Sequence, residues 1–379
     1  MATPNIHPSD LIVQPLSRAE TIPSSWYTDA AFHAFDREAI FDHSWHGVGH
    51  VSCLRNAGDY IVATVAGNPV LVVRGQDDRL CAFYNVCRHR GGPLALEDGC
   101  GKVLQCKYHG WTYRLDGSLR GTPKFDRTEL FDKKDYGLVP VNLAVWEGLV
   151  FVNLDAHAEP VETYVAGIAE RIAPIALSKM KFYKRVPYSI QCNWKVYVDN
   201  YLEGYHLPFV HPELCTLLDF QRYMTETYQW YSFQYSPIQQ QQNIYGEAGA
   251  MAYYYFIWLN FMLNILPDRL QTNLVLPEAH NRCTVVFDYY YTDIESAAAR
   301  ERAEADIAYS HKIQLEDMQI CEQVQKGLES KAYEKGRFSV EFENAVHYFQ
   351  SLLKRTYREY LSSQEGGDRR KGGVAETVG

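Results

Sequence analysis

Two short pairs of potential metal ligands occur in the N-terminal half of the chain, as Cys87-x-His89 and Cys106-x-x-His109. Each pair offers one thiolate and one imidazole, and two such loops at hairpin tips can converge on one site. The order suits a [2Fe–2S] cluster in which two thiolates hold one iron and two imidazoles hold the other, which raises the reduction potential. The flanking glycines let the backbone approach inorganic sulfide; they are Gly91, Gly92 and Gly110.

A structural zinc site with two cysteines and two histidines is the alternative interpretation of these four residues. Zinc fingers more often place both cysteines in one loop and both histidines in the other. Here each loop carries one of each, with Gly-Gly-Pro after the first pair and Gly-Trp after the second. The pattern therefore favours the iron–sulfur cluster.

A second group of potential ligands is Glu203-x-x-His206-x-x-x-x-His211. On a helix, Glu203 and His206 would share a face, whereas a straight helix would splay His211 away from them. Pro208 predicts a helix break just after His206, which lets His211 return toward the same metal. Two imidazoles and one carboxylate form the facial triad of non-haem Fe(II) oxygenases, which leaves positions open for O2 and substrate.

The carboxylate of this triad must come from elsewhere, and the C-terminal helix offers Glu316 and Asp317 side by side. They project about 100° apart. The apolar positions Ile313, Ile320 and Val324 indicate a buried face that includes Asp317 and turns Glu316 aside. Position alone fits a solvated carboxylate equally well, so the choice of Asp317 depends on the resemblance described below.

The elements around these residues predict two domains. Residues 24–48 read as a helix, and residues 45–155 form an all-β unit with turns near Gly67 and at Asp116-Gly117. The second domain, 156–362, contains strands over 253–291 and helices over 294–328 and 340–362. We expect an N-terminal helical arm over 1–44 and a disordered tail over 363–379, which is charged and lacks apolar anchors.

Composition excludes several classes of function. The 379 residues carry a net charge of −9 without a basic block, so we expect no nucleic-acid partner. No apolar stretch is long enough to span a membrane, and the first residues lack the pattern of a secretory signal. Nine cysteines, an odd number in a long chain, indicate free thiols in a reducing compartment. We therefore predict a cytoplasmic protein without a membrane partner.

Over residues 25–360 the chain resembles the α subunit of the Rieske non-haem iron oxygenases. The second half is most similar to choline monooxygenase and to the related oxygenases of glycine betaine, carnitine and stachydrine. The segments that carry this resemblance are Cys192-Asn193-Trp194-Lys195, DNYLEGYH, LQTNLVLP, VVFDYYY and LEDMQICEQVQKGLESKAYEKGR. One departure is His347-Tyr348-Phe349-Gln350, where choline monooxygenases tend to have His-His-Phe-His, and it leaves the exact substrate open.

The resemblance implies an α+β fold, with an N-terminal all-β Rieske domain and a C-terminal catalytic domain in which helices cap an antiparallel sheet. Cys87, His89, Cys106 and His109 match the ligands of the Rieske [2Fe–2S] cluster, and His206, His211 and Asp317 match those of the mononuclear Fe(II). Glu203 matches the acidic residue that bridges neighbouring subunits of a homotrimer. No GxGxxG follows a strand, so we expect electrons from a separate NAD(P)H-dependent flavin and iron–sulfur reductase.

The predicted reaction uses O2 to hydroxylate or N-demethylate a small quaternary-ammonium substrate. Aromatic faces bind such a cation, and the candidates near the metal-binding segment are Tyr197, Tyr201, Tyr205, Phe209 and Trp258. The alternative is ring hydroxylation or O-demethylation of an aromatic compound. An aromatic acid would need Arg or Lys in the pocket, whereas residues 197–215 contain neither.

Overall fold

The computed structural model describes residues 4–239, 245 and 250–371. The chain forms two compact units. Unit 1 comprises Met1–Ile40, Arg185–Asp288 and Glu295–Gly379, and unit 2 comprises Phe41–Lys184 and Tyr289–Ile294. The expected boundary near residue 155 lies instead between residues 184 and 185, because the segment after residue 155 packs with the β-rich unit.

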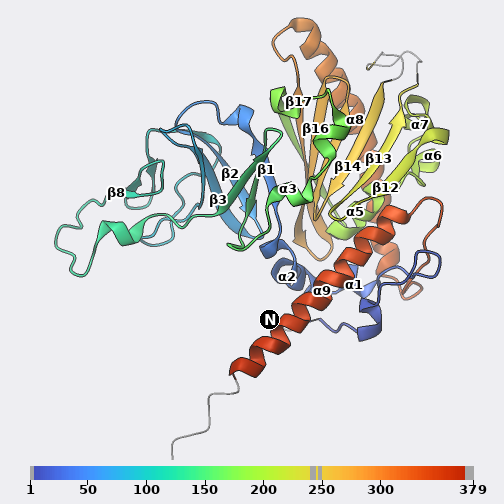
Figure 1. Cartoon of the computed structure of the whole chain (residues 1–379), viewed down its shortest axis with the longest axis horizontal. Helices are drawn as coiled ribbons and strands as arrows, with labels where there is room; N and C mark the ends of the chain where they lie inside the picture. The colour runs from blue at the N-terminus through green and yellow to red at the C-terminus, as the bar shows by residue number, and fades with distance from the viewer. Residues whose placement is uncertain (1–3, 240–244, 246–249, 372–379) are drawn as a thin grey trace, which may run out of the picture. The chain divides into compact units, whose positions relative to one another are not determined.

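Unit 2 is built from short antiparallel strands and tight turns, as the sequence predicts (Figure 1). Its three sheets have the orders β1-β10-β9, β4-β3-β2-β5 and β6-β7-β8. The strands are β1 (His46–His50), β2 (Asp59–Val65), β3 (Asn68–Arg74), β4 (Leu80–Tyr84), β5 (Gly99–Cys100), β6 (Leu104–Gln105), β7 (Thr112–Tyr113), β8 (Leu119–Gly121), β9 (Asn142–Trp146) and β10 (Leu149–Asn153). Two short helices follow, α3 (Val161–Tyr164) and α4 (Ile168–Ile172).

Unit 1 contains a seven-stranded sheet with the order β11-β17-β16-β15-β14-β13-β12. The strands are β11 (Lys181–Ile190), β12 (Met224–Thr227), β13 (Tyr231–Pro237), β14 (Met251–Ile257), β15 (Phe261–Leu266), β16 (Arg269–Ala279) and β17 (Arg282–Tyr291). Neighbours from β12 to β16 pair antiparallel. A two-residue turn joins β15 to β16, so that Leu266 pairs with Arg269, and Asp268 in this turn has a φ of 59°.

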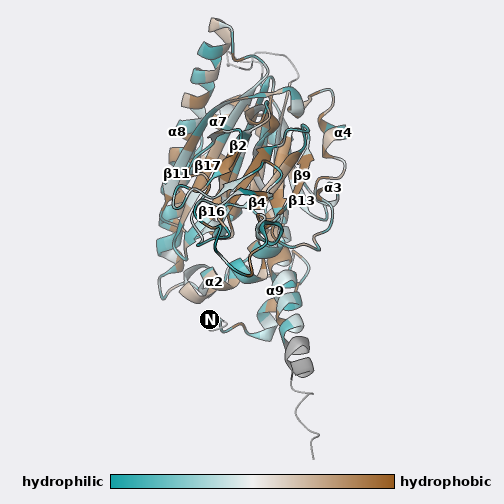
Figure 2. Ribbon diagram, turned by 90° about the vertical axis from the view of Figure 1, so that its left-hand side faces the viewer, coloured by the Kyte–Doolittle hydropathy of each residue, from teal (hydrophilic) through white to brown (hydrophobic). Residues whose placement is uncertain are grey.

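Helices accompany this sheet, which confirms the expected helix-capped architecture. They are α1 (Ser25–Thr28), α2 (Ala30–Ala39), α5 (Trp194–Tyr201), α6 (Leu207–Val210), α7 (Leu214–Leu217), α8 (Ala297–Leu328) and α9 (Asn344–Lys371). Ser296 caps α8 by accepting a hydrogen bond from the amide of Ala299, and Asn193 caps α5 by accepting from that of Lys195. Figure 2 shows apolar residues concentrated in the strands, whereas α8 carries polar residues over much of its length.

The ends of the chain differ from the expected boundaries. The predicted helix over 24–48 is divided into α1 and α2, and the strand β1 already begins at His46. At the other end, α9 continues past residue 362 to Lys371. The tail was predicted from residue 363, but its first part is therefore helical, and residues 372–379 lie outside the described residues.

The N-terminal segment is an integral part of unit 1 rather than a separate arm. Trp26 and Phe35 each lie 4.9 Å, between ring centroids, from Tyr357 of α9. The carboxylate of Asp36 accepts a hydrogen bond from Tyr357 and forms an ion pair with Lys195, and neither side chain of the pair is more than 2% exposed. The cluster thus joins α1, α2, α5 and α9 through aromatic packing and one buried ion pair.

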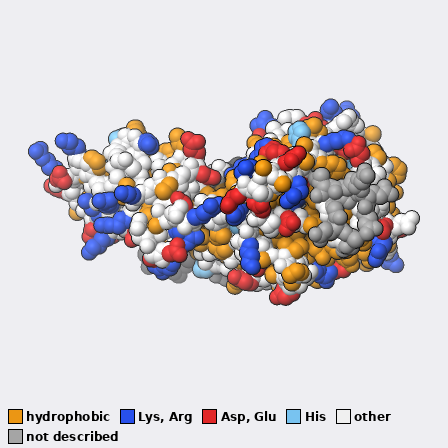
Figure 3. Space-filling view, turned by 90° about the horizontal axis from the view of Figure 1, so that it is seen from above, with side chains coloured by type: hydrophobic (Ala, Val, Ile, Leu, Met, Phe, Trp, Pro, Cys, Tyr) orange, Lys and Arg blue, Asp and Glu red, His pale blue; other side chains and the backbone are white. Residues whose placement is uncertain are grey.

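Among the described residues, no helix combines the length and the apolar character that crossing a bilayer requires. On the face drawn in Figure 3, Lys and Arg side chains are interspersed with Asp and Glu side chains.

The Asp36–Lys195 pair leads to a prediction about stability. Lys195→Met leaves the Asp36 carboxylate buried without its counter-ion, so we expect a loss of about 3–5 kcal/mol in the free energy of unfolding. Lys312→Met is the matched control, because Lys312 and its partner Glu213 are both at least half exposed, and it should cost less than about 1 kcal/mol. Urea denaturation of the two variants measures the difference, and equal losses would contradict this role of the buried pair.

Candidate metal sites and the adjoining cavity

The two Cys–His loops of unit 2 have the same backbone geometry. The amide of Cys87 donates to the carbonyl of Gly92, and the amide of Gly91 donates back to that of Cys87. In the second loop, between β6 and β7, the same two bonds join Cys106 to Trp111 and Gly110. Gly91 and Gly110 have φ values of +74° and +72°, which other residues adopt only with strain. The two loops therefore have equivalent backbones, each of which carries one thiol and one imidazole.

The side chains of these loops fit a [2Fe–2S] cluster. Both thiols are buried, the rings of His89 and His109 lie 4.6 Å apart between centroids, and Nδ1 of His89 is buried without a partner among the described residues. A buried ring nitrogen without a hydrogen bond is costly unless it binds a metal. A Cβ at Gly92 would lie 2.9 Å from Sγ of Cys106, so glycine keeps the surroundings of that thiol open.

The segment that carries Glu203, His206 and His211 differs from the predicted one. Helix α5 ends at Tyr201, before Glu203, and the one-turn helix α6 then separates His206 from His211. Pro208 lies in the first turn of α6 instead of ending the preceding helix, because proline is well accommodated in the first turn. Gly204 lets this segment pack closely, since a Cβ there would lie 2.9 Å from the ring of Tyr223. The two histidines therefore flank a short helix and converge.

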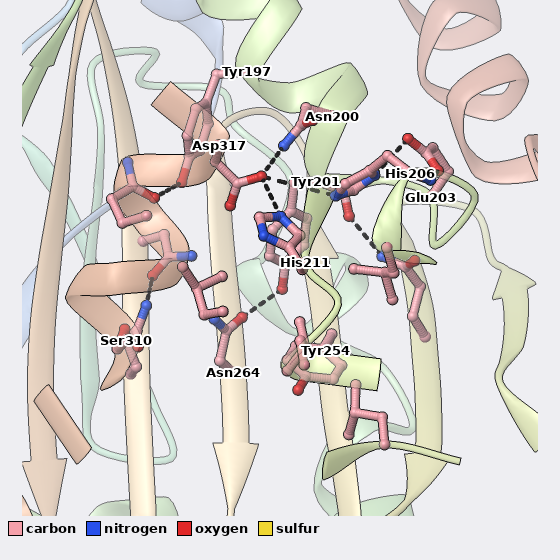
Figure 4. Close-up of a pocket in the computed structure, with 18 of the residues that line it drawn as sticks. Tyr197, Asn200, Tyr201, Glu203, His206, His211, Tyr254, Asn264, Ser310 and Asp317 are labelled. Atoms are coloured by element: carbon pink, nitrogen blue, oxygen red, sulfur yellow. Dashed lines mark hydrogen bonds and ion pairs between the residues drawn. The ribbon is translucent and has the colours of Figure 1, made fainter. Parts of the chain in front are cut away.

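His206, His211 and Asp317 come together as the sequence predicts (Figure 4). One ligand atom of each lies within 4.8 Å of those of the other two, and this is the only such group of three among the described residues. Oδ1 of Asp317 is 2.9 Å from Nε2 of His211 and 3.8 Å from Nε2 of His206. Both imidazoles thus direct the same nitrogen toward one carboxylate.

Carboxylates also hold the other nitrogen of each imidazole. Glu203 accepts a hydrogen bond from Nδ1 of His206 at 2.7 Å, although Glu203 lies after the end of α5 and does not share a helix with His206 as predicted. Glu316 accepts from Nδ1 of His211, also at 2.7 Å. From the sequence, Glu316 is only the alternative to Asp317 as a ligand, and its spacing does not indicate this role. Asn200 was not predicted either; it donates to Oδ1 of Asp317 at 2.7 Å and fixes that carboxylate.

The electrostatics of this group suit a cation. Burial lowers the pKa of His211, but hydrogen bonds and negative charge from Asp317 and Glu316 outweigh it and raise the pKa above its usual value. The field that favours a proton on the ring also favours a metal ion bound to its neutral form. Two imidazoles, one carboxylate and carboxylate partners on the outer ring nitrogens are the donor set of a mononuclear iron site.

A cavity adjoins the metal-binding group and encloses about 650 Å³ of space, part of it open to solvent. Its walls combine aromatic rings with amide side chains, and none of its described lining residues is Lys or Arg. The aromatic members are Tyr197, Tyr201, Tyr223, Tyr254 and Phe287. The amide members are Asn200, Gln234, Asn264, Gln271, Asn273 and Gln314.

Two of the five predicted substrate-contacting aromatics, Tyr197 and Tyr201, line this cavity. The other three are not among its lining residues, and their contact with a substrate stays a prediction. Tyr205 is half exposed and stacks on Phe342, Phe209 is 80% exposed, and Trp258 is buried near Phe349. They were predicted because most of them are close in sequence to the metal ligands, whereas Tyr223, Tyr254 and Phe287 reach the cavity from elsewhere in the chain.

The departure at Gln350 lies away from the cavity. Gln350 is buried, accepts a hydrogen bond from the amide of Ile22, and donates to Tyr27 and Asp199. It therefore joins α9 to the N-terminal segment and to α5. This position has a structural role, and its difference from the pattern HHFH changes no residue of the cavity wall.

Comparisons with known proteins match both halves of the chain. The family described as "Rieske [2Fe-2S] domain" matches residues 44–140, and the family "Ring hydroxylating alpha subunit (catalytic domain)" matches residues 177–359. Choline monooxygenase of Arabidopsis thaliana is 35% identical over 357 residues, which cover 89% of this chain and 83% of that protein. The carnitine monooxygenase oxygenase subunit of Escherichia coli K12 is 32% identical over 356 residues, which cover 90% of this chain and 95% of that protein.

Solved structures give the same result. A quaternary ammonium Rieske monooxygenase, described with carnitine oxidation and inter-subunit electron transfer, superposes with a TM-score of 0.85 at 30% identity. The match covers 94% of this chain and all of that one. Naphthalene 1,2-dioxygenase with bound indole superposes with a TM-score of 0.75 at 17% identity, which shows a shared fold only.

The geometry assigns different roles to the two neighbouring carboxylates of α8. Asp317→Asn removes the charged ligand atom, so we expect the metal at His206 and His211 to be lost. Glu316→Gln keeps Asp317 and disturbs only the outer nitrogen of His211, so metal affinity should fall by about 10–100-fold. Elemental analysis of the purified variants at limiting metal separates the two effects, with cluster absorbance as the internal control. Metal retained in Asp317→Asn but lost in Glu316→Gln would reverse the assignment.

Proposed function

Since the chain belongs to the Rieske non-haem iron oxygenases, in the family that includes choline and carnitine monooxygenases, we propose that it hydroxylates or N-demethylates a small quaternary-ammonium compound. It is an O2-dependent oxidoreductase whose cofactors are a Rieske [2Fe–2S] cluster and a mononuclear non-haem iron. The observation that carries the substrate class is the cavity beside the metal-binding group, which is lined by aromatic rings and amides without Lys or Arg among its described residues.

We infer that Cys87 and Cys106 hold one iron of the cluster and His89 and His109 the other. His206, His211 and Asp317 would hold the mononuclear iron. When bound, the cluster would supply electrons and the mononuclear iron would activate O2, so that one oxygen atom enters a substrate C–H bond and the other leaves as water. A hydroxylated N-methyl group then collapses to formaldehyde and the demethylated amine, whereas a hydroxylated CH2OH group gives an aldehyde hydrate.

The protein's own residues bind the substrate and orient the metal ligands. Aromatic faces stabilise a quaternary ammonium by about 0.5–2 kcal/mol for each well-placed ring, and Tyr201, Tyr223 and Tyr254 are available in the cavity wall. Glu203 and Glu316 fix both imidazoles in the tautomer that leaves Nε2 free of its proton. Asn200 holds the Asp317 carboxylate from the side.

Electrons must come from a partner protein, and we propose a separate NAD(P)H-dependent reductase. We also propose a homotrimer, in which Glu203 connects a cluster histidine of one subunit to His206 of the next. The inter-subunit electron transfer described for the 30%-identical solved structure supports this arrangement. The cytoplasmic location expected from the sequence stays a prediction, supported by nine cysteines, none of which is in a disulfide in the described part of the chain.

Turnover with a generic reductase tests the function. Choline, carnitine, glycine betaine and a set of aromatic acids are supplied in turn, while O2 consumption, formaldehyde and aldehyde are measured. We expect product from at least one quaternary ammonium, with one O2 consumed per product, and none from His206→Ala, which serves as the control. Product from aromatic acids alone would establish the alternative function.

Glu203→Gln tests the role of the carboxylate beside His206. Glu203 accepts from both the ring and the backbone amide of His206. A glutamine has only one acceptor oxygen, so its NH2 group must face one of these two donors. With both metals supplied in excess, we expect the variant to load them and to accept electrons into its cluster, but to lose most of its turnover.

The cluster of this variant should be reoxidised much more slowly than that of the wild type when O2 and substrate are added. Stopped-flow absorbance of the pre-reduced protein measures the rate. A variant that is only less stable, but reoxidises at the normal rate, would limit Glu203 to positioning this segment.

A further inference from the structure

A row of polar side chains crosses the sheet of unit 1 and forms one wall of the cavity. Gln234 of β13 pairs with Tyr254 of β14, Tyr254 with Asn264 of β15, and Asn264 with Gln271 of β16. Directly paired residues of neighbouring antiparallel strands project from the same face. All four side chains line the cavity, so the row presents one continuous polar surface to it.

At the β16 end of this row, hydrogen bonds run in one direction. Arg269 donates to Oε1 of Gln271, and Nε2 of Gln271 donates to Oδ1 of Asn273 at 2.6 Å. A guanidinium has no acceptor, so Arg269 fixes which end of the Gln271 amide is the oxygen. Ser310 of α8 donates to the same oxygen at 2.9 Å. The chain of bonds therefore ends on the NH2 group of Asn273.

This terminal NH2 group is available to a ligand. Asn273 lines the cavity, and its Nδ2 donates to no other group in the described part of the chain. Gln314 provides a second donor, because its Oε1 accepts from Tyr197 while its Nε2 is buried without a partner among the described residues. Gln314 is 1% exposed and lines the same cavity. A buried amide left without an acceptor is costly, so Gln314 favours a ligand oxygen, and Asn273 offers that oxygen a second donor in the same cavity.

The positions along α8 relate these donors to the metal-binding group. Ser310, Gln314 and Asp317 follow one another at helical spacing and share the face that lines the cavity. The rise from Ser310 to Asp317 is about 10 Å. Figure 4 shows Ser310 and Asn264 below the side chains of His206, His211 and Asp317. Because Asn273, Gln314 and the three metal-binding residues all line this cavity, one small molecule in it can contact both groups together.

We propose that Asn273 and Gln314 form a subsite for an uncharged, hydrogen-bond-accepting oxygen of the substrate. This inference rests on the proposed function and specifies its substrate as a quaternary ammonium with a hydroxyl group. Asn273 is the residue that determines this specificity, and Gln271 positions it. The aromatic walls hold the ammonium group, and the amides select the oxygen.

The charges near the subsite favour an uncharged oxygen over a carboxylate. The only arginine that reaches the row through the contacts described, Arg269, is paired at 2.7 Å with Asp306, and both side chains are buried. Its positive charge is therefore compensated within the protein. A carboxylate in this position would be buried opposite neutral amides only, and burying a charge without a counter-charge is costly.

A cycle of two variants and two ligands tests the subsite. Choline and propyltrimethylammonium differ only in an OH group against a CH3 group. For the wild type and Asn273→Leu, kcat/KM is measured for both compounds, and binding to the resting protein is measured by titration calorimetry. We expect Asn273→Leu to lower the kcat/KM and the affinity for choline by about tenfold more than those for propyltrimethylammonium. Gln314→Met should give a loss in the same direction.

Equal losses for the two ligands in both variants would overturn the subsite. If Asn273→Leu does not fold, Gln271→Met decides in the same cycle, because it keeps Asn273 but no longer orients its amide. A wild type that prefers glycine betaine, with that preference lost in Asn273→Leu, would overturn the assignment of an uncharged oxygen. Absence of turnover with every quaternary ammonium would contradict the proposed function instead, while the calorimetric cycle still decides the subsite.

Discussion

The arrangement of this protein depends on one constraint: two imidazoles must present the same nitrogen to a single carboxylate. His206 and His211 meet Asp317 through Nε2 because Glu203 and Glu316 hold their Nδ1 atoms. Three elements must be in register for this to occur, namely the segment after α5, the one-turn helix α6 and the long helix α8. The capping of α5 by Asn193, the proline in the first turn of α6 and the close approach at Gly204 all serve that register.

Much of this could be read from the sequence, and the reasons are local. Ligand spacing indicated the four residues for a cluster and the two histidines for a facial triad, because such side chains occur in few arrangements that suit these groups. The choice of Asp317 depended on the resemblance. The all-β unit followed from its turns. The helix before His206 was misplaced because proline both ends helices and begins them, and only the fold shows which occurs. The boundary of unit 2 was misplaced because composition changes near residue 155, whereas packing changes near residue 185.

The cavity wall could not be predicted from the sequence, because it is assembled from distant segments. The buried face of α8 carries Gln314, Cys321 and Gln325 rather than a simple apolar stripe, and Val324, expected to be buried, is 44% exposed. These glutamines are buried because they have partners elsewhere, as when Gln325 accepts from the amide of Asn193. Periodicity detects apolar faces and does not detect amides whose partners lie over a hundred residues away.

The turn between β15 and β16 determines more than the path of the chain. Because Leu266 pairs with Arg269 across two residues, Asn264 faces Gln271, and both project into the cavity. Side chains alternate between the faces of a strand, so one inserted residue in this turn would move Arg269, Gln271 and Asn273 to the opposite face together. The polar side chains that β16 contributes to the pocket are therefore kept or lost together. A point substitution changes one contact with the ligand, whereas a change in the length of this turn would replace the whole β16 part of the cavity wall at once.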